Sequence, residues 1–247
     1  TVIGPSLNKL RAFTTRTPVR LLIGQSSGLD LRSVFTGRKI ILIPLSSGEV
    51  GRPVAELLGS LLLARLWAAV RARTAVAPER RTPAFIYLDE FQDFLRLPLD
   101  ITDLLATARG LGVGLTLAHQ HLDQLPTPVR AGVLSTARNR VVFQVGHDDA
   151  GVLARHLAPL TADDLMHLDA HAVAVQGVHE GAVQRPVTGQ TDPLDAPRVG
   201  ALDVRRLSRE HYGRPRTDVE AEIRNRTQNP AGETPLGRRR TRRQEDQ

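Results

Sequence analysis

Polar and charged side chains follow three of the apolar runs in this sequence, and each of these runs has the length of a β-strand. The runs and the groups that follow them are 84–88 before Asp89-Glu90, 113–118 before His119-Gln120-His121, and 140–145 before Gly146-His147-Asp148-Asp149. Ligands of α/β proteins gather at the carboxyl ends of parallel strands. We therefore expect any chemistry of this chain at these three strand ends.

Asp89-Glu90 has the form of a Walker B motif, because it follows the four apolar residues 85–88. In such a motif the first acid holds the shell of a Mg²⁺ ion, and the second orients or polarises an attacking water. A strand that ends in a helix-capping carboxylate would explain Asp89 alone equally well. The second acid, together with Phe91 and Phe94 after it, favours the Walker B interpretation.

Gln120 follows the next strand along the chain and can reach a γ-phosphate or the attacking water from there. A glutamine that caps the following turn is an equally good interpretation of the sequence. His119 and His121 lie on one face of an extended segment without a third ligand nearby in the sequence, which disfavours a metal site.

Arg109, Arg138 and Arg140 are candidates to contact phosphate charge, in their own subunit or across an interface. In a chain so rich in arginine, a plain surface position is the alternative for each of them. The glycine-rich segment 109–114 precedes a strand instead of following one, so it does not fit a phosphate-binding loop. Lys9 is followed by Leu10 and Lys39 by Ile40, so neither lysine can end a Walker A loop, and the sequence predicts no standard ATP site of its own.

The composition is that of an ordinary soluble globular protein, with 247 residues, 41% hydrophobic and 24% charged residues, and no cysteine. The absence of cysteine excludes disulfides and thiolate metal sites. Five of the seven net positive charges come from arginines between positions 238 and 243, so the remaining balance of +2 does not argue for binding to nucleic acid. The longest apolar stretch, 54–70, contains Glu56 and Arg65 and is too short and too charged for a membrane span.

Strand patterns alternate with helix patterns along most of the chain. We expect strands at 19–23, 40–45, 84–89, 113–118, 140–145 and 172–176, and helices at 53–73, 100–109, 127–136, 148–157 and 161–168. The run 40–45 is apolar throughout, which predicts burial on both faces. The alternation predicts an α/β domain over residues 1–184, with a mostly parallel sheet and helices on both of its faces. Residues 185–247 form an Arg/Pro-rich extension that is expected to be irregular and partly disordered, with a short helix at 219–226.

In their order and spacing, these stretches resemble the C-terminal part of the conjugative coupling proteins of type IV secretion (the TraD/TraG kind), which belong with the FtsK/HerA translocases. The resemblance spans about residues 8–176. It rests on the blocks 37–48, Gly51 with the long helix after it, 87–92, 106–112, 117–120, 142–146 and 149–150. It implies a RecA-like fold, in which Asp89 and Glu90 are the Walker B acids, Gln120 is the sensor, and Arg109 or Arg140 is the arginine finger. The chain departs from the family pattern in lacking Walker A and in carrying Ser135-Thr136-Ala137 where relatives often have Asn.

The same resemblance implies a cofactor, partners and a location. It implies ATP with Mg²⁺ held indirectly by Asp89, and a homo-hexameric ring that drives DNA or a nucleoprotein through its pore. Relaxosome or type IV secretion components are the implied partners, and the cytoplasmic face of the inner membrane is the implied location. Walker A and any membrane anchor would then lie upstream of Thr1, and this segment itself would be soluble.

Two other functions fit the same residues. A non-catalytic, ATPase-derived platform that binds secretion or relaxosome partners would explain the missing lysine and the arginine-rich tail. An Mg²⁺-dependent hydrolase or nuclease would use the two acid pairs Asp89-Glu90 and Asp148-Asp149 at strand ends.

Overall fold

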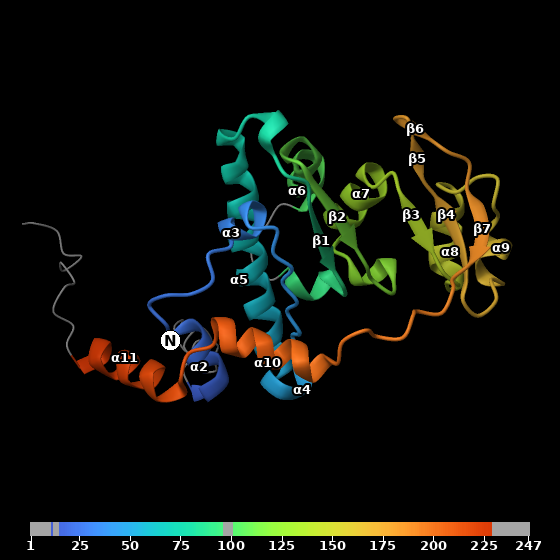
Figure 1. The fold of residues 1–247 in the computed structure, drawn as a ribbon. Coiled ribbons are helices and arrows are strands. Elements are labelled where there is room, and N and C mark those ends of the chain that lie inside the picture. Colours follow the sequence, from blue (N-terminus) through green and yellow to red (C-terminus); the bar gives the residue numbers. More distant parts are fainter. Residues whose placement is uncertain (1–10, 12–14, 96–100, 229–247) are drawn as a thin grey trace, which may run out of the picture. The chain divides into compact units, whose positions relative to one another are not determined.

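The computed structural model describes residues 11, 15–95 and 101–228 of the chain (Figure 1). It is a mixed α/β structure that divides into two compact units. The larger unit comprises residues 29–196, and the smaller one combines the described parts of 1–28 and 197–247. The arginines at 238–243, Lys9 and the disorder expected at the C-terminus lie outside the described residues.

The larger unit contains the elements from α3 to β7. Its α-helices are α3 (Arg32–Thr36), α4 (Ser47–Val50), α5 (Arg52–Arg71), α6 (Ile101–Ala108), α7 (Thr127–Thr136), α8 (His147–Ala154) and α9 (Ala162–Met166). Its 3₁₀ turns are η1 (Ala72–Ala75), η2 (Pro78–Arg80), η3 (Phe91–Phe94), η4 (Arg109–Leu111) and η5 (Leu122–Gln124). Its strands are β1 (Ala84–Leu88), β2 (Val113–Leu117), β3 (Arg140–Val142), β4 (Ala172–Gln176), β5 (Val178–His179), β6 (Ala182–Val183) and β7 (Val187–Gln190).

Strands β1 and β2 form a two-stranded parallel sheet in which Ala84 pairs with Val113 and Leu88 with Leu117. Alternate residues of both strands face a core to which α5, α6 and α7 contribute, and this core includes Val70, Phe91 and Leu104. Such a core forms because apolar residues recur at helical spacing in the helices and at every second position in the strands. The helices predicted at 53–73, 100–109 and 127–136 and the two strands are confirmed.

A second, antiparallel sheet has the strand order β3-β4-β7. Helices α8 and α9 contribute to its core, which includes Leu157, Leu165 and Ala174, each with no exposed surface. Thr161 caps α9 as the sequence predicts, because its hydroxyl accepts a hydrogen bond from the Asp164 backbone N–H. Among the described strands only β1 and β2 pair in parallel, so the mostly parallel sheet predicted from the alternation is not what forms here.

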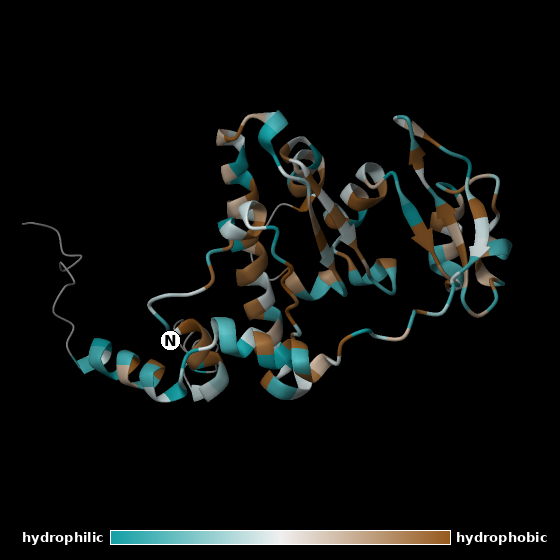
Figure 2. Ribbon diagram, viewed as in Figure 1, coloured by the Kyte–Doolittle hydropathy of each residue, from teal (hydrophilic) through white to brown (hydrophobic). Residues whose placement is uncertain are grey.

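One face of the β1-β2 sheet is uncovered within the described residues. Phe85 and Tyr87 point away from the core and are 70% and 73% exposed. No described strand pairs with either outer edge of this sheet. In Figure 2 brown parts of the two strands are interrupted by paler ones. A parallel sheet is normally covered on both faces, so the exposure of Phe85 and Tyr87 on this one is unusual.

Residues 40–45 do not form the buried strand that their apolar run predicts. They precede α4 as an irregular segment, with Ile40 88% and Leu42 78% exposed. An extended segment becomes a strand only when a neighbouring strand accepts its backbone hydrogen bonds, and no described strand lies beside this one. The prediction of a strand at these positions is wrong for this structure.

The smaller unit consists of α2 (Thr17–Ile23), α10 (Ala201–Tyr212) and α11 (Arg216–Gln228). The strand predicted at 19–23 is wrong, because these residues belong to α2, which carries Pro18 in its first turn, a position where proline favours a helix. Val19 of α2 and Val219 of α11 are both buried. The helix predicted at 219–226 is confirmed and longer than expected, and β7 and α10 have no counterpart in the prediction.

One described segment, Arg52–Ala75, is long and apolar enough to cross a membrane by length and composition alone, with a mean hydropathy of 1.5 over its best window. Half of that window is buried against the rest of the chain, as in a core helix of a soluble protein. This is weak evidence for a membrane span, and the packing of α5 against the β1-β2 sheet explains its apolar character.

Candidate functional site at the carboxyl ends of β1 and β2

The parallel register places the ends of β1 and β2 beside each other. The Ala118 N–H donates to the Leu88 carbonyl at 2.9 Å, and the Phe91 N–H donates to the Ala118 carbonyl at 3.2 Å. Glu90 lies between these bonds in the left-handed backbone region, with φ 48° and ψ 48°. This conformation is uncommon outside glycine, and it turns the chain sharply so that Phe91 enters the core. Backbone strain of this kind is concentrated at functional sites.

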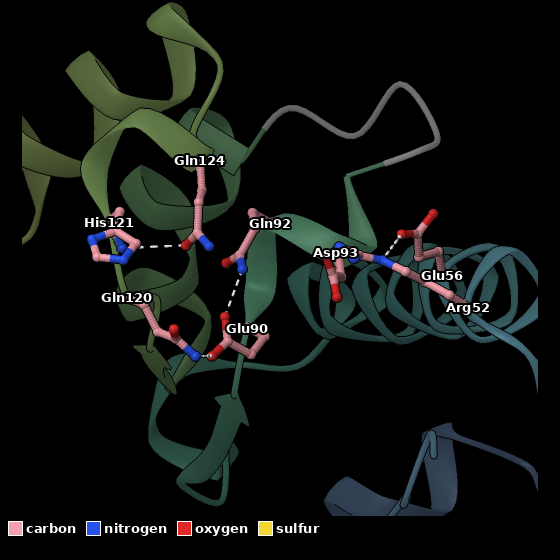
Figure 3. A network of polar contacts seen from close by, with 8 residues as sticks. All are labelled: Arg52, Glu56, Glu90, Gln92, Asp93, Gln120, His121 and Gln124. Carbon is pink, nitrogen blue, oxygen red and sulfur yellow. Dashed lines mark hydrogen bonds and ion pairs between the residues drawn. The ribbon is translucent and has the colours of Figure 1, made fainter. Parts of the chain in front are cut away.

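The Glu90 carboxylate meets two glutamine amides (Figure 3). Gln120 Nε2 donates to Glu90 Oε1 at 2.5 Å, and Gln92 Nε2 donates to Glu90 Oε2 at 2.6 Å. The structure therefore brings together Glu90 and Gln120, which the sequence predicts at neighbouring strand ends. Asp89 lies next to them with an exposed side chain whose Oδ1 accepts a hydrogen bond from the Glu90 N–H at 3.1 Å.

This arrangement suits acid–base chemistry on a bound water. A carboxylate fixed by two amide donors keeps a defined direction, and an oxygen released from one donor can accept a proton. The neighbouring Asp89 carboxylate, exposed to solvent, can hold a hydrated Mg²⁺ ion through water, as hard oxygen ligands do.

The turn that follows Glu90 is anchored to α5. Arg52 donates to Glu56 at 2.9 Å and to Asp93 at 3.3 Å, which links the start of α5 to η3 (Figure 3). The hydrogen bond to Glu56, with the charge of Asp93, raises the pKa of Arg52 above its ordinary value. Phe94 of η3 packs so closely on Gly59 that a Cβ atom there would lie 2.3 Å from its ring. The position of the turn is thus set by the first half of α5.

His119 packs its ring against Phe91 in an edge-to-face contact, with 5.6 Å between ring centroids. Burial lowers the pKa of His119 below its ordinary value of 6.5, against the opposing charges of Asp149 and Glu90. His119 is therefore neutral near pH 7 and serves as a packing residue beside the site.

Asp148 and Asp149 belong to a cavity that Glu90 does not line. They line an open cavity of about 430 Å³ together with His121, Asp123, Gln124, Gly146 and His147. Asp149 is buried, accepting a hydrogen bond from the Leu122 N–H at 3.1 Å. Neither Asp89 nor Glu90 lines this cavity, and within the described residues no group of three or more His, Asp or Glu side chains is placed to hold a metal ion. The two acid pairs are thus not assembled into the single metal centre that a nuclease of this kind would need.

The three candidate arginines occupy different environments. Arg140 donates to Gln176 Oε1 at 2.8 Å and to the Leu134 carbonyl at 2.7 Å, and burial lowers its pKa. Arg138 donates to the Gly181 carbonyl at 2.5 Å. Arg109 is exposed in η4, which precedes β2 and so lies at the amino end of the sheet, away from Glu90.

Sequence reasoning gave no role to Gln92 or to the group formed by Arg52, Glu56 and Asp93. The spacing of Arg52 and Glu56, four residues apart in a helix, was the available signal for that ion pair. Gln92 had no such signal, because its contact with Glu90 depends on the left-handed turn between them.

Comparison with known proteins adds no assignment for this site. No family model matches the chain, and no curated protein matches it.

Proposed function

We propose that this chain is the C-terminal part of a ring-forming, DNA-translocating ATPase of the type IV secretion coupling kind, with a RecA-like fold. In this function Asp89 holds Mg²⁺ through water, Glu90 polarises the water that attacks the γ-phosphate of ATP, and Gln120 senses the nucleotide. DNA, relaxosome or secretion components and further copies of the chain in a homo-hexamer are the partners. The location that goes with this function is the cytoplasmic face of the inner membrane.

The single observation that carries the proposal is the hydrogen bond between Gln120 and Glu90. It joins the ends of two adjacent parallel strands at 2.5 Å, at the sheet edge where α/β proteins bind ligands. A glutamine at a strand end that only caps its own turn is not expected to bind a carboxylate that follows the neighbouring strand. The contact therefore favours the sensor interpretation over the capping one.

The incomplete sheet supports a larger RecA-like layer. Both outer edges of the β1-β2 pair are free of described strands, and Phe85 and Tyr87 are exposed on its open face. A strand that ends in a Walker A loop would have to end at the same side of the sheet as Glu90 to bring its lysine to the nucleotide. A free outer edge of this pair offers such a strand its backbone hydrogen bonds.

Arg109 is the better candidate for an arginine finger, since the hydrogen bonds of Arg140 bind it within its own subunit. Arg109 and Glu90 lie at opposite ends of five-residue strands, which span roughly 17 Å at ~3.3 Å per residue. Arg109 could therefore act only on the nucleotide of a neighbouring copy, in a head-to-tail ring.

Measurement of ATP turnover tests this function. The 247-residue chain alone should show none, whereas a chain extended upstream to include a Walker A loop should show turnover that DNA stimulates. Glu90→Gln in the extended chain should reduce turnover by about 10²–10⁴-fold, the usual contribution of a general base. Glu79→Gln is the matched control, because Glu79 is exposed in η2 before β1. Turnover that persists in Glu90→Gln would remove the assignment.

A non-catalytic platform is the second candidate, and the exposed apolar residues favour it. Ile40, Leu42, Phe85 and Tyr87 are all more than two-thirds exposed, as on a surface that a partner covers. This candidate predicts capture of a secretion or relaxosome component without nucleotide, and partner binding that Glu90→Gln leaves unchanged. ATP-dependent binding that Glu90→Gln alters would instead support the ATPase.

A further inference from the structure

The two polar ends of the Gln92 side chain have very different surroundings. Its Nε2 donates to Glu90 Oε2 at 2.6 Å, whereas its Oε1 is buried and has no hydrogen-bond partner among the described residues. A buried acceptor without a donor is unfavourable, and an apolar side chain of similar length would fill the space without that penalty. Packing therefore does not explain why this position holds a glutamine. The hydrogen bond from its side-chain amide to Glu90 does explain it.

The side-chain amides of Gln92 and Gln120, which both bind Glu90, differ in how strongly the surrounding structure fixes them. Gln92 is partly buried in η3, where it follows Phe91 and precedes Asp93. Phe91 is buried, and the hydrogen bond from Arg52 connects Asp93 to α5. Gln120 comes from the end of the other strand, and its side chain is exposed. The Gln92 amide is thus fixed relative to Glu90, while the Gln120 amide has room to turn away.

We infer that Gln92 is a positioning residue for Glu90, which holds Oε2 in place and leaves Oε1 to face the attacking water when Gln120 releases it. The inference rests on the proposed ATPase function. In the hydrolysis step, Glu90 Oε1 accepts a proton from the attacking water while the oxygen of this water forms a bond to the γ-phosphorus. The bond from that phosphorus to the β–γ bridging oxygen breaks, ADP and phosphate leave, and Glu90 then returns the proton to solvent.

The first test reads the contact in the 247-residue chain, through the NMR signals of its glutamine side-chain amides. A hydrogen bond to a carboxylate moves amide protons downfield and slows their exchange with water. We expect Gln92 to show both effects relative to Gln184, whose amide meets only backbone carbonyls. Glu90→Ala should return the Gln92 signals to the range of Gln184. Signals of Gln92 that do not respond to Glu90→Ala overturn the inference.

The second test separates positioning from structural support. In the chain extended upstream with Walker A, Gln92→Met should lower kcat for ATP at least tenfold and leave KM for ATP unchanged. In the 247-residue chain, the same substitution should leave Tm unchanged or raise it, because it removes the buried unpaired oxygen. Gln184→Met, the matched control, should change neither kcat nor KM. A Gln92→Met chain with full kcat, or one whose Tm falls together with kcat, contradicts a positioning role.

The two proposals fail in different ways. An extended chain without DNA-stimulated turnover removes the ATPase function, whereas turnover that survives Glu90→Gln removes the catalytic role of Glu90. Either result also removes the catalytic meaning of the Gln92 contact. Turnover that Glu90→Gln abolishes but Gln92→Met leaves intact removes only the role of Gln92.

Discussion

Arg140 begins β3, and the groups around its side chain give it a structural role. Its guanidinium supplies hydrogen bonds to Gln176, which is 7% exposed, and to the Leu134 carbonyl. Arg140→Ala should therefore lower the free energy of unfolding by about 1–3 kcal/mol, the usual loss when buried acceptors are left unpaired. Urea unfolding followed by circular dichroism measures the change.

Arg138→Ala is the control for Arg140. Arg138 is exposed and bonds only the Gly181 carbonyl, so its loss should change stability by less than about 0.5 kcal/mol. If Arg140→Ala is as stable as the wild type, Arg140 has no structural role and is again a candidate for the arginine finger that acts on another subunit.

His119 should make stability depend on pH in the acid range. Burial lowers its pKa in the folded chain below the ordinary 6.5, so the unfolded chain binds the proton first as the pH falls. The stability contribution of the neutral ring is full above pH 6.5 and is lost as the pH drops below that value. The NMR signal of the His119 ring should titrate with a midpoint below 6.5.

His119→Phe keeps an aromatic contact with Phe91 and should reduce the loss of stability between pH 6.5 and 5. Burial also lowers the pKa of His156, so part of the pH dependence should remain in this variant. A His119→Phe chain with the full wild-type slope would contradict this role of His119.

At the scale of elements, the packing of α5 on η3 links the fold to the site. Gly59→Ala would place a Cβ atom 2.3 Å from the Phe94 ring and 2.9 Å from Leu45. The substitution should destabilise the chain by about 1–3 kcal/mol, as overpacking does, although alanine is the better helix former. Thermal or urea unfolding measures the loss.

Gly151→Ala in α8 is the matched control for Gly59→Ala, because a Cβ atom there meets nothing within 4 Å. It should stabilise the chain by about 0.5–1 kcal/mol through helix propensity and a smaller entropy loss. Substitutions of equal effect at the two glycines would show that the close contact with Phe94 has little energetic weight.

Elements whose apolar pattern is satisfied within the chain could be predicted from the sequence, and those that depend on distant partners could not. Helix α7 and strand β4 have the predicted bounds, because their own periodicity and nearby turn residues determine them. Residues 40–45 have the strongest strand pattern but no neighbouring strand among the described residues, and residues 19–23 become a helix that packs with α11.

The same distinction holds in the site. Glu90 and Gln120 could be placed together because strand ends in parallel register meet at one edge. The contacts of Gln92 and Asp93 could not, since they depend on the left-handed backbone of Glu90 and on the direction of α5. A sequence pattern carries the period of an element but not the torsion of a single residue that links two elements.

At the scale of the whole molecule, the smaller unit joins segments about 200 residues apart. Glu222 of α11 accepts a hydrogen bond from the Ser26 N–H at 2.5 Å and pairs with Arg214 at 2.8 Å. These bonds, those from Ser26 first, lower the pKa of Glu222 to about 2. The stability they provide is full above pH 4.5, the ordinary value for a glutamate, and is lost as the pH falls through about 2.

Amide NMR signals of Val19 and Val219 should therefore keep their folded positions at pH 4.5 and change as the pH approaches 2. Glu222→Gln should weaken the packing of α2 and α11 at neutral pH and remove this acid transition. Thr227→Val is the control, since its hydroxyl bonds only to carbonyls of its own helix. An acid transition that is unchanged in Glu222→Gln would show that another group holds the two helices.

The pairing of α2 with α11 also has a consequence for the order in which the chain folds during synthesis. Val19 is buried in the same unit as Val219, which the ribosome adds 200 residues later. At roughly 5–20 residues per second, α2 waits for about 10–40 s before its partner helix exists. During that interval its apolar face is open to chaperones or to other nascent chains, and the larger unit can fold before the smaller one is complete.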